Sequence, residues 1–287
     1  MLSIRKRKGC IVKKIYTFGA QPALRSVTIP CMQQAKAEGR KLIQTTANTA
    51  EEARAVEEAG FDMMVCDAAN AHIVRSANKT TFCTAAIKIG DFTSVDEIMR
   101  EAWRVLMLGV DAIITPRSFH TIEALTREGI PVMGHLGLVP RKSVAIGGLR
   151  AVGKTAHEAL ELYRDFKRLE NVGAFAVESE VIVGSVLTEI AKKTSLICVS
   201  LGSGAGGDVS FLFMNDLCGE TENPPRHARA FGNLKAKYDE LHRERLVALE
   251  AFKNASLDGS FPTIYQTPNM DKAEFEAFQN ALEKIEI

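Results

Sequence analysis

The 287-residue chain lacks an excess of charge of either sign. Its 36 Lys and Arg residues nearly balance 35 Asp and Glu residues, and the formal net charge is +1. Without a positive field the chain has no electrostatic drive toward the phosphates of a nucleic acid, so nucleic-acid binding is not expected. The chain also lacks any apolar run of about eighteen residues, the length that a membrane-spanning helix needs. We therefore expect no contact with a membrane either.

Closely spaced cysteine pairs are missing as well. The six cysteines are scattered with no C-x-x-C pair among them, and Cys66 and Cys198 lie inside apolar runs. This pattern is typical of a reduced chain rather than of a disulfide framework, so we expect a cytoplasmic protein. The basic N-terminus, MLSIRKRKGCIVKK, is not followed by the apolar segment of a targeting signal, and we interpret residues 1–26 as a solvated N-terminal arm.

What the chain does contain is a regular alternation of apolar runs and helical stretches. A short helix is predicted over VTIPCMQQAKAEGRK, and charged helices are predicted after residue 226. Strands are predicted between them at residues 42–46, 61–66, 85–89, 112–114, 132–133, 174–177 and 196–199. Continuous apolar strands are typical of a parallel sheet covered by helices. We predict an α/β fold, a single (β/α)₈ TIM barrel over residues 27–287 with a C-terminal helical extension, and a doubly wound sheet is the alternative.

Polar side chains follow several of these predicted strands. In a barrel of this kind the active site lies where the strands end and the loops lead into helices. The residues at the predicted strand ends are Asp67, Asp91, Pro116, His135, Glu180 and Ser200. Four of the six are ionisable and come from four separate strands, which is the convergence that a catalytic site requires.

Asp67 and Asp91 each come just after an apolar strand. Two carboxylates from neighbouring strands could share a hard divalent cation such as Mg²⁺, with waters and a substrate oxo acid completing its coordination. The alternative is that each aspartate caps the helix that follows it. Asp91 fits this alternative less well, because Ser94 begins a capping box, Ser-Val-Asp-Glu, ahead of the next helix.

His135 and Glu180 are the candidate catalytic residues. His135 follows Gly134 at the start of a long basic, glycine-bearing loop, and loops of that length inside a compact domain are usually functional. A histidine there could equally be a buried imidazole bonded to the backbone. Glu180 could remove a proton next to a carbonyl, or it could simply begin a helix, and Glu178 competes with it for the role of base.

Two glycine-containing stretches each allow two interpretations. Residues 148–155, GLRAVGKT, match the P-loop pattern G-x-x-x-x-G-K-[ST], but no strand precedes them, so we expect no nucleotide binding there. The run GSGAGGD begins at Gly202 and includes Gly204. It could cradle a phosphate group of a cofactor through its N–H groups, or it could let the backbone approach a ligand closely.

The chain resembles the ketopantoate hydroxymethyltransferase (3-methyl-2-oxobutanoate hydroxymethyltransferase) family of the phosphoenolpyruvate/pyruvate barrel superfamily, over about residues 27–262. The most specific piece is GIPVMGHLGLVPRKSVAIGGLRAVGKT, which is similar to the family segment GHLGLTPQ…GGYRVQG. Further similar pieces are AGFDMMVCDA, IGDF, GAFAVESE, LGSGAGGDVSFLFMNDLCG and GSFP.

This resemblance implies that Asp67 and Asp91 are Mg²⁺ ligands, that Glu180 is the catalytic base, and that His135 lies near the reacting carbon. It also implies methylenetetrahydrofolate as co-substrate and assembly into a large homo-oligomer, an octamer or a decamer. The function implied is Mg²⁺-dependent enolisation of a 2-oxo acid and transfer of a hydroxymethyl unit to it. The alternatives are a 2-oxo-acid C–C lyase of the same superfamily and a catalytically silent barrel that serves as a binding subunit.

The chain departs from the family pattern at several positions. Ala68 stands where the family has Ser after the first metal-binding Asp, and the family TAYD turn reads TTAN at residues 45–48. The family places a Lys and a Glu after its fourth strand, where this chain has Ile114 and Pro116. The segment between Asp67 and Asp91 is also shorter. Arg117 and Lys88 are candidates to replace the missing cation.

Overall fold

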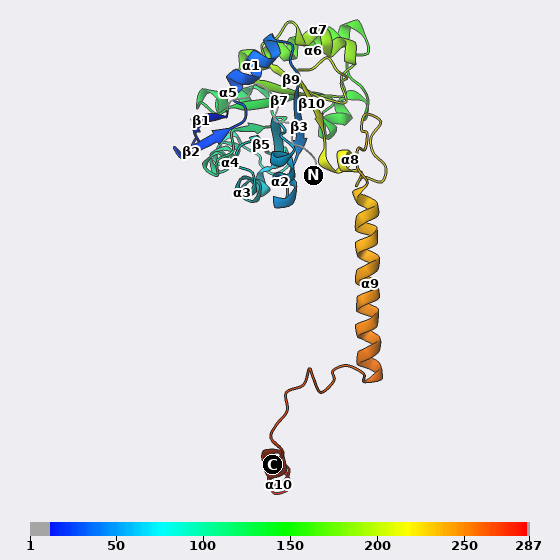
Figure 1. Cartoon of the computed structure of the whole chain (residues 1–287). Coiled ribbons are helices and arrows are strands. Elements are labelled where there is room, and N and C mark those ends of the chain that lie inside the picture. The colour runs from blue at the N-terminus through cyan, green and yellow to red at the C-terminus, as the bar shows by residue number, and fades with distance from the viewer. Residues whose placement is uncertain (1–11, 286–287) are drawn as a thin grey trace. The chain divides into compact units, whose positions relative to one another are not determined.

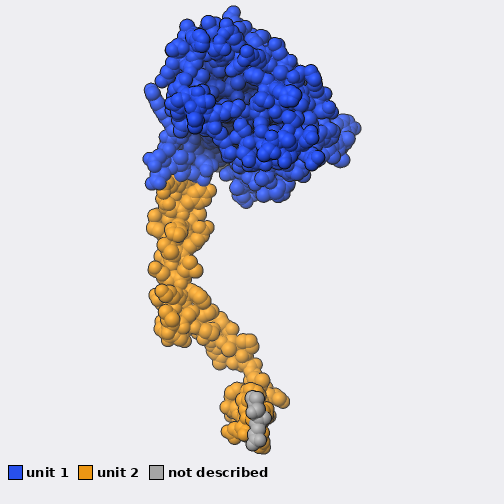
Figure 2. Space-filling view, turned by 180° about the vertical axis from the view of Figure 1, so that it is seen from behind, with its two compact units in different colours: residues 1–232 blue, residues 233–287 orange. Residues whose placement is uncertain are grey.

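The structure is a computed structural model that describes residues 12–285, and the chain divides into two compact units (Figure 2). The first unit covers residues 1–232 and the second residues 233–287. The first contains the strands and the cavity described below. Among the described residues, no helix is both long and apolar enough to cross a membrane.

The first unit is a closed barrel of eight parallel strands (Figure 1). Each strand pairs with the next in the sequence, and the last returns to pair with the first. The strands are β3 (Leu42–Thr46), β4 (Met63–Asp67), β5 (Phe82–Ala86), β6 (Ala112–Ile114), β7 (Val132–Gly137), β8 (Ala176–Glu180), β9 (Ile197–Leu201) and β10 (Val209–Leu212). The predicted (β/α)₈ barrel is confirmed, and closure through β10 and β3 rules out the doubly wound sheet, which has open edges.

Several strand assignments differ from the prediction, including β8, which ends at Glu180 rather than at residue 177. β10 was not identified, because it is four residues long and follows a glycine-rich run. β5 begins and ends three residues earlier than predicted, so Lys88 lies in the loop after the strand rather than inside it. β7 continues through His135 to Gly137, so this histidine is part of the strand rather than the first residue of the loop.

Helices cover the outside of the barrel. They are α2 (Ala50–Glu58), α3 (Ala71–Ala77) after the short η1 (Ala68–Asn70), α4 (Val95–Met107), α5 (Phe119–Arg127), α6 (Ala156–Asn171), α7 (Gly184–Ala191) and α8 (Met214–Cys218). The predicted capping box of α4 is confirmed, because Ser94 Oγ accepts from the Glu97 N–H and the Glu97 carboxylate accepts from the Ser94 N–H. No helix lies between β9 and β10.

Helix α1 (Ile29–Ala37) contributes to the core inside the barrel. Its Met32 and Ala35 are fully buried and belong to one cluster with Leu42 and Met63, which lie at the amino ends of their strands. We infer that α1 closes this end of the barrel and leaves the carboxyl ends of the strands for the site. The helix predicted here is confirmed, with Pro30 in its first turn and Gly39 just beyond its end.

Residues 13–25 of the predicted N-terminal arm are not irregular. They form an antiparallel ribbon of β1 (Lys13–Tyr16) and β2 (Pro22–Arg25). Arg25 is buried, and its Nε lies 2.7 Å from Oδ1 of Asp111 in the loop before β6. The first eleven residues of the arm lie outside the described residues.

The second unit contains the C-terminal helices α9 (Leu234–Asp258) and α10 (Lys272–Leu282). Asn233 caps the start of α9, because its side chain accepts from the Ala236 N–H, and Gly259 ends the helix in the left-handed conformation. Neither helix has a buried residue, although both carry large apolar side chains.

Candidate active site

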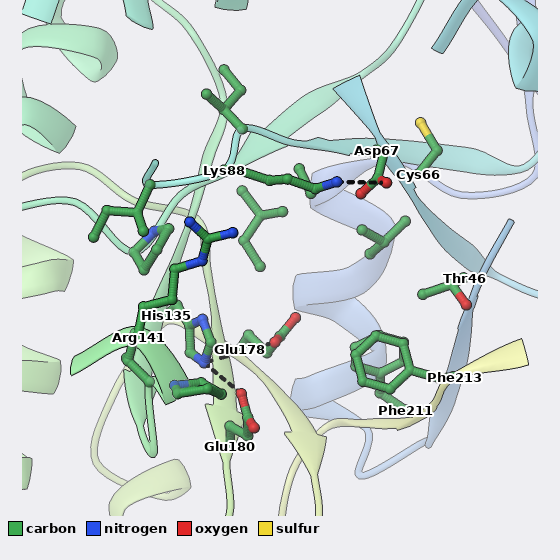
Figure 3. A pocket seen from close by; sticks show the side chains of 18 of the residues that line it. Thr46, Cys66, Asp67, Lys88, His135, Arg141, Glu178, Glu180, Phe211 and Phe213 are labelled. Carbon is green, nitrogen blue, oxygen red and sulfur yellow. Dashed lines mark hydrogen bonds and ion pairs between the residues drawn. The ribbon is translucent and has the colours of Figure 1, made fainter. Parts of the chain in front are cut away.

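A cavity of about 660 Å³ opens at the carboxyl ends of the barrel strands (Figure 3). Parallel strands all end on the same face of a closed barrel, so side chains far apart in the sequence meet there. The acidic, basic and histidine residues that line the cavity are Asp67, Lys88, His135, Arg141, Glu178, Glu180 and Asp216. Ile114, Phe211 and Phe213 form part of an apolar wall.

His135, Glu178 and Glu180 form the buried acid–base group of this cavity. The β7–β8 register pairs His135 with Glu178 and Gly137 with Glu180, which brings the three side chains together. Nε2 of His135 lies 2.9 Å from Oε2 of Glu180 and 3.8 Å from Oε1 of Glu178. The three side chains are between 9% and 14% exposed, so their charges interact in a poorly hydrated setting.

Burial and the neighbouring charges together shift the pKa values of His135 and Glu178. For His135, burial alone lowers the pKa, but the hydrogen bond to Glu180 and the charges of Glu178 and Glu180 outweigh it, and the pKa is raised above its ordinary value. Burial also raises the pKa of Glu178, and the charge of Glu180 adds to that effect while His135 opposes it. His135 therefore favours its protonated form, in which its positive charge lies close to both carboxyl groups.

The same three side chains could hold a divalent ion. Their ligand atoms all lie within 4.8 Å of one another. One imidazole nitrogen with two carboxylate oxygens is a donor set for Zn²⁺ or another transition metal more than for Mg²⁺, which prefers oxygen ligands.

Asp67 lines the cavity, but its carboxylate already has a cationic partner. Nζ of Lys88, in the loop after β5, lies 2.9 Å from Oδ2 of Asp67. Asn48 accepts a hydrogen bond from the Asp67 N–H and so fixes the end of β4. Asp91 is exposed and does not line the cavity.

The structure therefore does not bring Asp67 and Asp91 together in the cavity as ligands of one Mg²⁺ ion. A divalent ion on Asp67 would lie beside the Lys88 ammonium and be repelled by it. As they stand, these residues do not fit the predicted site, and their joint binding of Mg²⁺ stays a prediction.

Gly202 and Gly204 lie in the loop after β9 and do not line the cavity. Both have left-handed backbones, with φ of 68° and 76°, and the Gly204 carbonyl accepts from the Ser200 hydroxyl. A Cβ on Gly202 would lie 2.8 Å from the ring of His227, so this glycine permits a close approach within the chain. A cofactor-binding role for these two glycines stays a prediction.

The P-loop-like stretch uses its backbone donors internally. The N–H groups of Gly153 and Lys154 both donate to the Glu158 carboxylate, at 2.9 Å each. In a true P-loop such groups face a phosphate. The stretch holds a carboxylate of its own chain instead, in agreement with the expected absence of nucleotide binding.

The residues missed from the sequence are cationic and aromatic. Arg141 lines the cavity from η2 (Pro140–Ile146), and the sequence signal for it was present, because it replaces the Gln of the family motif GHLGLTPQ. Phe211 lies in β10, the strand that was not identified, and Phe213 follows it directly. Arg117 does not line the cavity, and it donates to the carbonyl groups of Ile89 and Phe92.

Comparison with known proteins agrees with the resemblance seen in the sequence. Residues 68–264 match the family model described as ketopantoate hydroxymethyltransferase. The 3-methyl-2-oxobutanoate hydroxymethyltransferase of Thermococcus kodakarensis is 33% identical over 219 residues, which cover 74% of this chain and 75% of that protein. The enzyme of the same name from Hyperthermus butylicus is 31% identical over 281 residues, covering 89% and 95%.

A solved structure of a protein with little sequence identity is similar in fold. The carboxyl transferase domain of Rhizobium etli pyruvate carboxylase with 3-hydroxypyruvate matches with a TM-score of 0.50 and 9% identity, covering 66% of this chain and 42% of that one. This likeness concerns the fold alone. The family match and the sequence identities show that the chain belongs to the ketopantoate hydroxymethyltransferase family of enzymes.

Proposed function

We propose that this protein transfers a hydroxymethyl unit from methylenetetrahydrofolate to a short 2-oxo acid, with 3-methyl-2-oxobutanoate as the first candidate. Family membership supports the reaction class. The single observation that carries the proposal is the 2.9 Å contact between His135 and Glu180 at the mouth of the barrel. A carboxylate held by an imidazole beside an open cavity is suited to removing a proton next to a carbonyl group.

In the proposed reaction Glu180 accepts the proton from the carbon beside the oxo group. The resulting enolate carbon forms a C–C bond to the one-carbon unit, whose bonds to tetrahydrofolate nitrogen break. Water supplies the oxygen and the proton of the new hydroxyl group, and its second proton and the proton held by Glu180 end on the two nitrogens of the departing tetrahydrofolate. His135 orients the Glu180 carboxylate and shares its proton.

This role of Glu180 and its use as a metal ligand exclude each other. A carboxylate bound to a divalent ion is a poor base, because the ion withdraws the lone pair that would accept the proton. We therefore assign the buried group to proton transfer. The charge that stabilises the enolate then comes from cationic side chains of the cavity.

Deuterium uptake at the carbon beside the oxo group, followed by NMR, tests the proposal directly. Wild-type protein in D₂O should exchange this hydrogen of 3-methyl-2-oxobutanoate or of another short 2-oxo acid. Glu180→Gln should slow exchange by about 10²–10⁴-fold, the usual contribution of a positioned base. Glu189→Gln, an exposed carboxylate of α7, is the matched control and should exchange normally.

Absence of exchange with every short 2-oxo acid would contradict the proposal and favour a silent barrel. Exchange without hydroxymethyl transfer, together with cleavage of a longer oxo acid, would instead favour a C–C lyase.

We also propose that the chain forms a homo-oligomer. The support comes from the second unit, where apolar side chains are exposed on both helices. Examples are Leu241 (50%) and Phe252 (57%) on α9, and Phe275 (46%) and Phe278 (49%) on α10. A helix with no buried residue gains little from packing, so association with another copy would supply the missing burial.

A further inference from the structure

Arg141 and Asp216 are the charged side chains of the cavity that make no side-chain hydrogen bond or ion pair within residues 12–285, and Arg141 is the cation of the two. Asp67 pairs with Lys88, and His135 pairs with both glutamates, whereas Arg141 makes no hydrogen bond or ion pair in the described structure. A guanidinium group presents five N–H donors in a planar fork that matches a carboxylate. An unpaired fork at the mouth of a cavity is available for an anionic ligand.

Gly90 shows that Arg141 lies next to the loop that carries Lys88, a second cationic side chain of the cavity. A Cβ at Gly90 would lie 2.4 Å from Nη1 of Arg141, so the guanidinium lies against the backbone of the loop that carries Lys88. In Figure 3 Arg141 faces the cavity on the same side as Lys88 and His135. Any larger residue at position 90 would displace the guanidinium.

Lys88 has N–H donors that are not used by its ion pair with Asp67. Its ammonium carries three hydrogens and has one partner, Asp67, while its side chain is 47% exposed. It can therefore keep the ion pair and still donate to a ligand in the cavity.

Apolar side chains also line the cavity. Ile114 and Pro116 line it where the family has Lys and Glu, and Phe211 and Phe213 pack edge to face with ring centroids 5.2 Å apart. A ligand with an anionic head and a short apolar tail matches these two surfaces.

We infer that Lys88 and Arg141 bind the carboxylate of the substrate, and that this pair of side-chain cations replaces a divalent ion at Asp67. The inference rests on the proposed function for the class of ligand, a short 2-oxo acid. Arg141 makes two parallel hydrogen bonds to the carboxylate, and Lys88 adds a point charge next to it. The cation that the family site obtains from solution is supplied here by the chain itself.

Calorimetric titration with two probes, 3-methyl-2-oxobutanoate and oxalate, tests the inference in excess EDTA and again in excess MgCl₂. Wild-type protein should bind with the same affinity in both. Arg141→Gln, which restores the family residue, and Lys88→Met should each weaken binding about ten-fold, as expected for one lost charged contact at a partly hydrated site. Lys154→Gln removes one charge of the same barrel outside the cavity and should bind as wild type does.

Thermal unfolding of each variant shows whether the fold is kept, which is expected because neither side chain is buried. The inference is overturned if wild-type binding requires Mg²⁺, if both variants bind like wild type, or if wild type binds neither probe. Arg141-dependent binding without deuterium exchange would uphold the inference and contradict the proposed function. Deuterium exchange that requires Mg²⁺ would support the proposed function and contradict the inference.

Discussion

At the scale of single residues, the charge on His135 decides the state of the buried group. Its raised pKa depends on a hydrogen bond to Glu180 and on the negative charge of its two carboxyl neighbours. The protonated imidazole offsets the cost of burying those carboxylates. Removing either carboxylate should lower the pKa of His135, because each raises it.

We expect the pKa of His135, measured by ¹⁵N NMR titration, to lie above its ordinary value of about 6.5. In Glu180→Gln it should fall relative to wild type, because the charged hydrogen-bond acceptor is lost. Glu189→Gln should leave it unchanged. A wild-type pKa below 6.5 would show that burial outweighs the two carboxylates, contrary to this prediction.

The raised pKa also sets a pH dependence of stability. Because the folded pKa lies above the unfolded value, protonated His135 stabilises the barrel fully below about pH 6.5, and this contribution is lost as the pH rises through the folded pKa. Urea unfolding of wild type should therefore show falling stability from about pH 6 upward, and His135→Gln should show a flatter profile over that range. Parallel profiles would mean that His135 keeps its ordinary pKa in the fold.

At the scale of secondary-structure elements, a buried ion pair attaches the N-terminal ribbon to the barrel. Arg25 of β2 donates to Asp111 and to the carbonyl groups of Leu24, Lys79 and Gly109. Asp111 also accepts from the Cys83 N–H at the start of β5. The ribbon is thus bonded directly to two loops of the barrel, the one before β5 and the one before β6.

Arg25→Met should lower the free energy of unfolding by about 3–5 kcal/mol, the usual cost of removing one partner of a buried pair. The physical reason is that Asp111 would remain buried without its cation. Urea unfolding measures the change, and Lys192→Met, which breaks an exposed pair on α7, should cost at most about 1 kcal/mol. Equal effects of the two substitutions would show that the ribbon contributes little to the barrel.

The P-loop-like stretch before α6 gives a second prediction at this scale. Lys154→Ala should leave activity within a few-fold of wild type and should not change thermal stability in the presence of ATP, because Glu158 already occupies the backbone donors. A thermal-shift screen with ATP checks this. Stabilisation by ATP in wild type that disappears in Lys154→Ala would restore the nucleotide-binding interpretation.

At the scale of the whole molecule, the second unit should control assembly. Sedimentation analysis of the full chain should show a homo-oligomer, and Phe252→Asp with Leu241→Asp on α9 should shift it to smaller species, because charges would replace exposed apolar side chains. Glu244→Gln, an exposed position of the same helix, serves as control. A monomeric wild-type protein would contradict the prediction.

Much of the barrel could be predicted from the sequence, because its signals are local. Apolar runs of four or five residues between helical stretches mark parallel strands, and the Ser94–Glu97 capping box marks the start of α4. β10 was not predicted because a four-residue strand after several glycines is too short to show a hydrophobic periodicity. The ribbon of β1 and β2 escaped because its short, largely exposed strands depend on Arg25 and its distant partners.

For the site, the sequence alone determined which strands end in ionisable residues, and the family motif singled out His135 and Glu180. Only the tertiary structure decided which of these groups meet. The register of β7 and β8 brings His135 against Glu178 and Glu180, Lys88 pairs with Asp67, and Asp91 remains outside the cavity. A charge's partner depends on distances of a few ångströms between segments far apart in the chain, and those distances exist only once the barrel has closed.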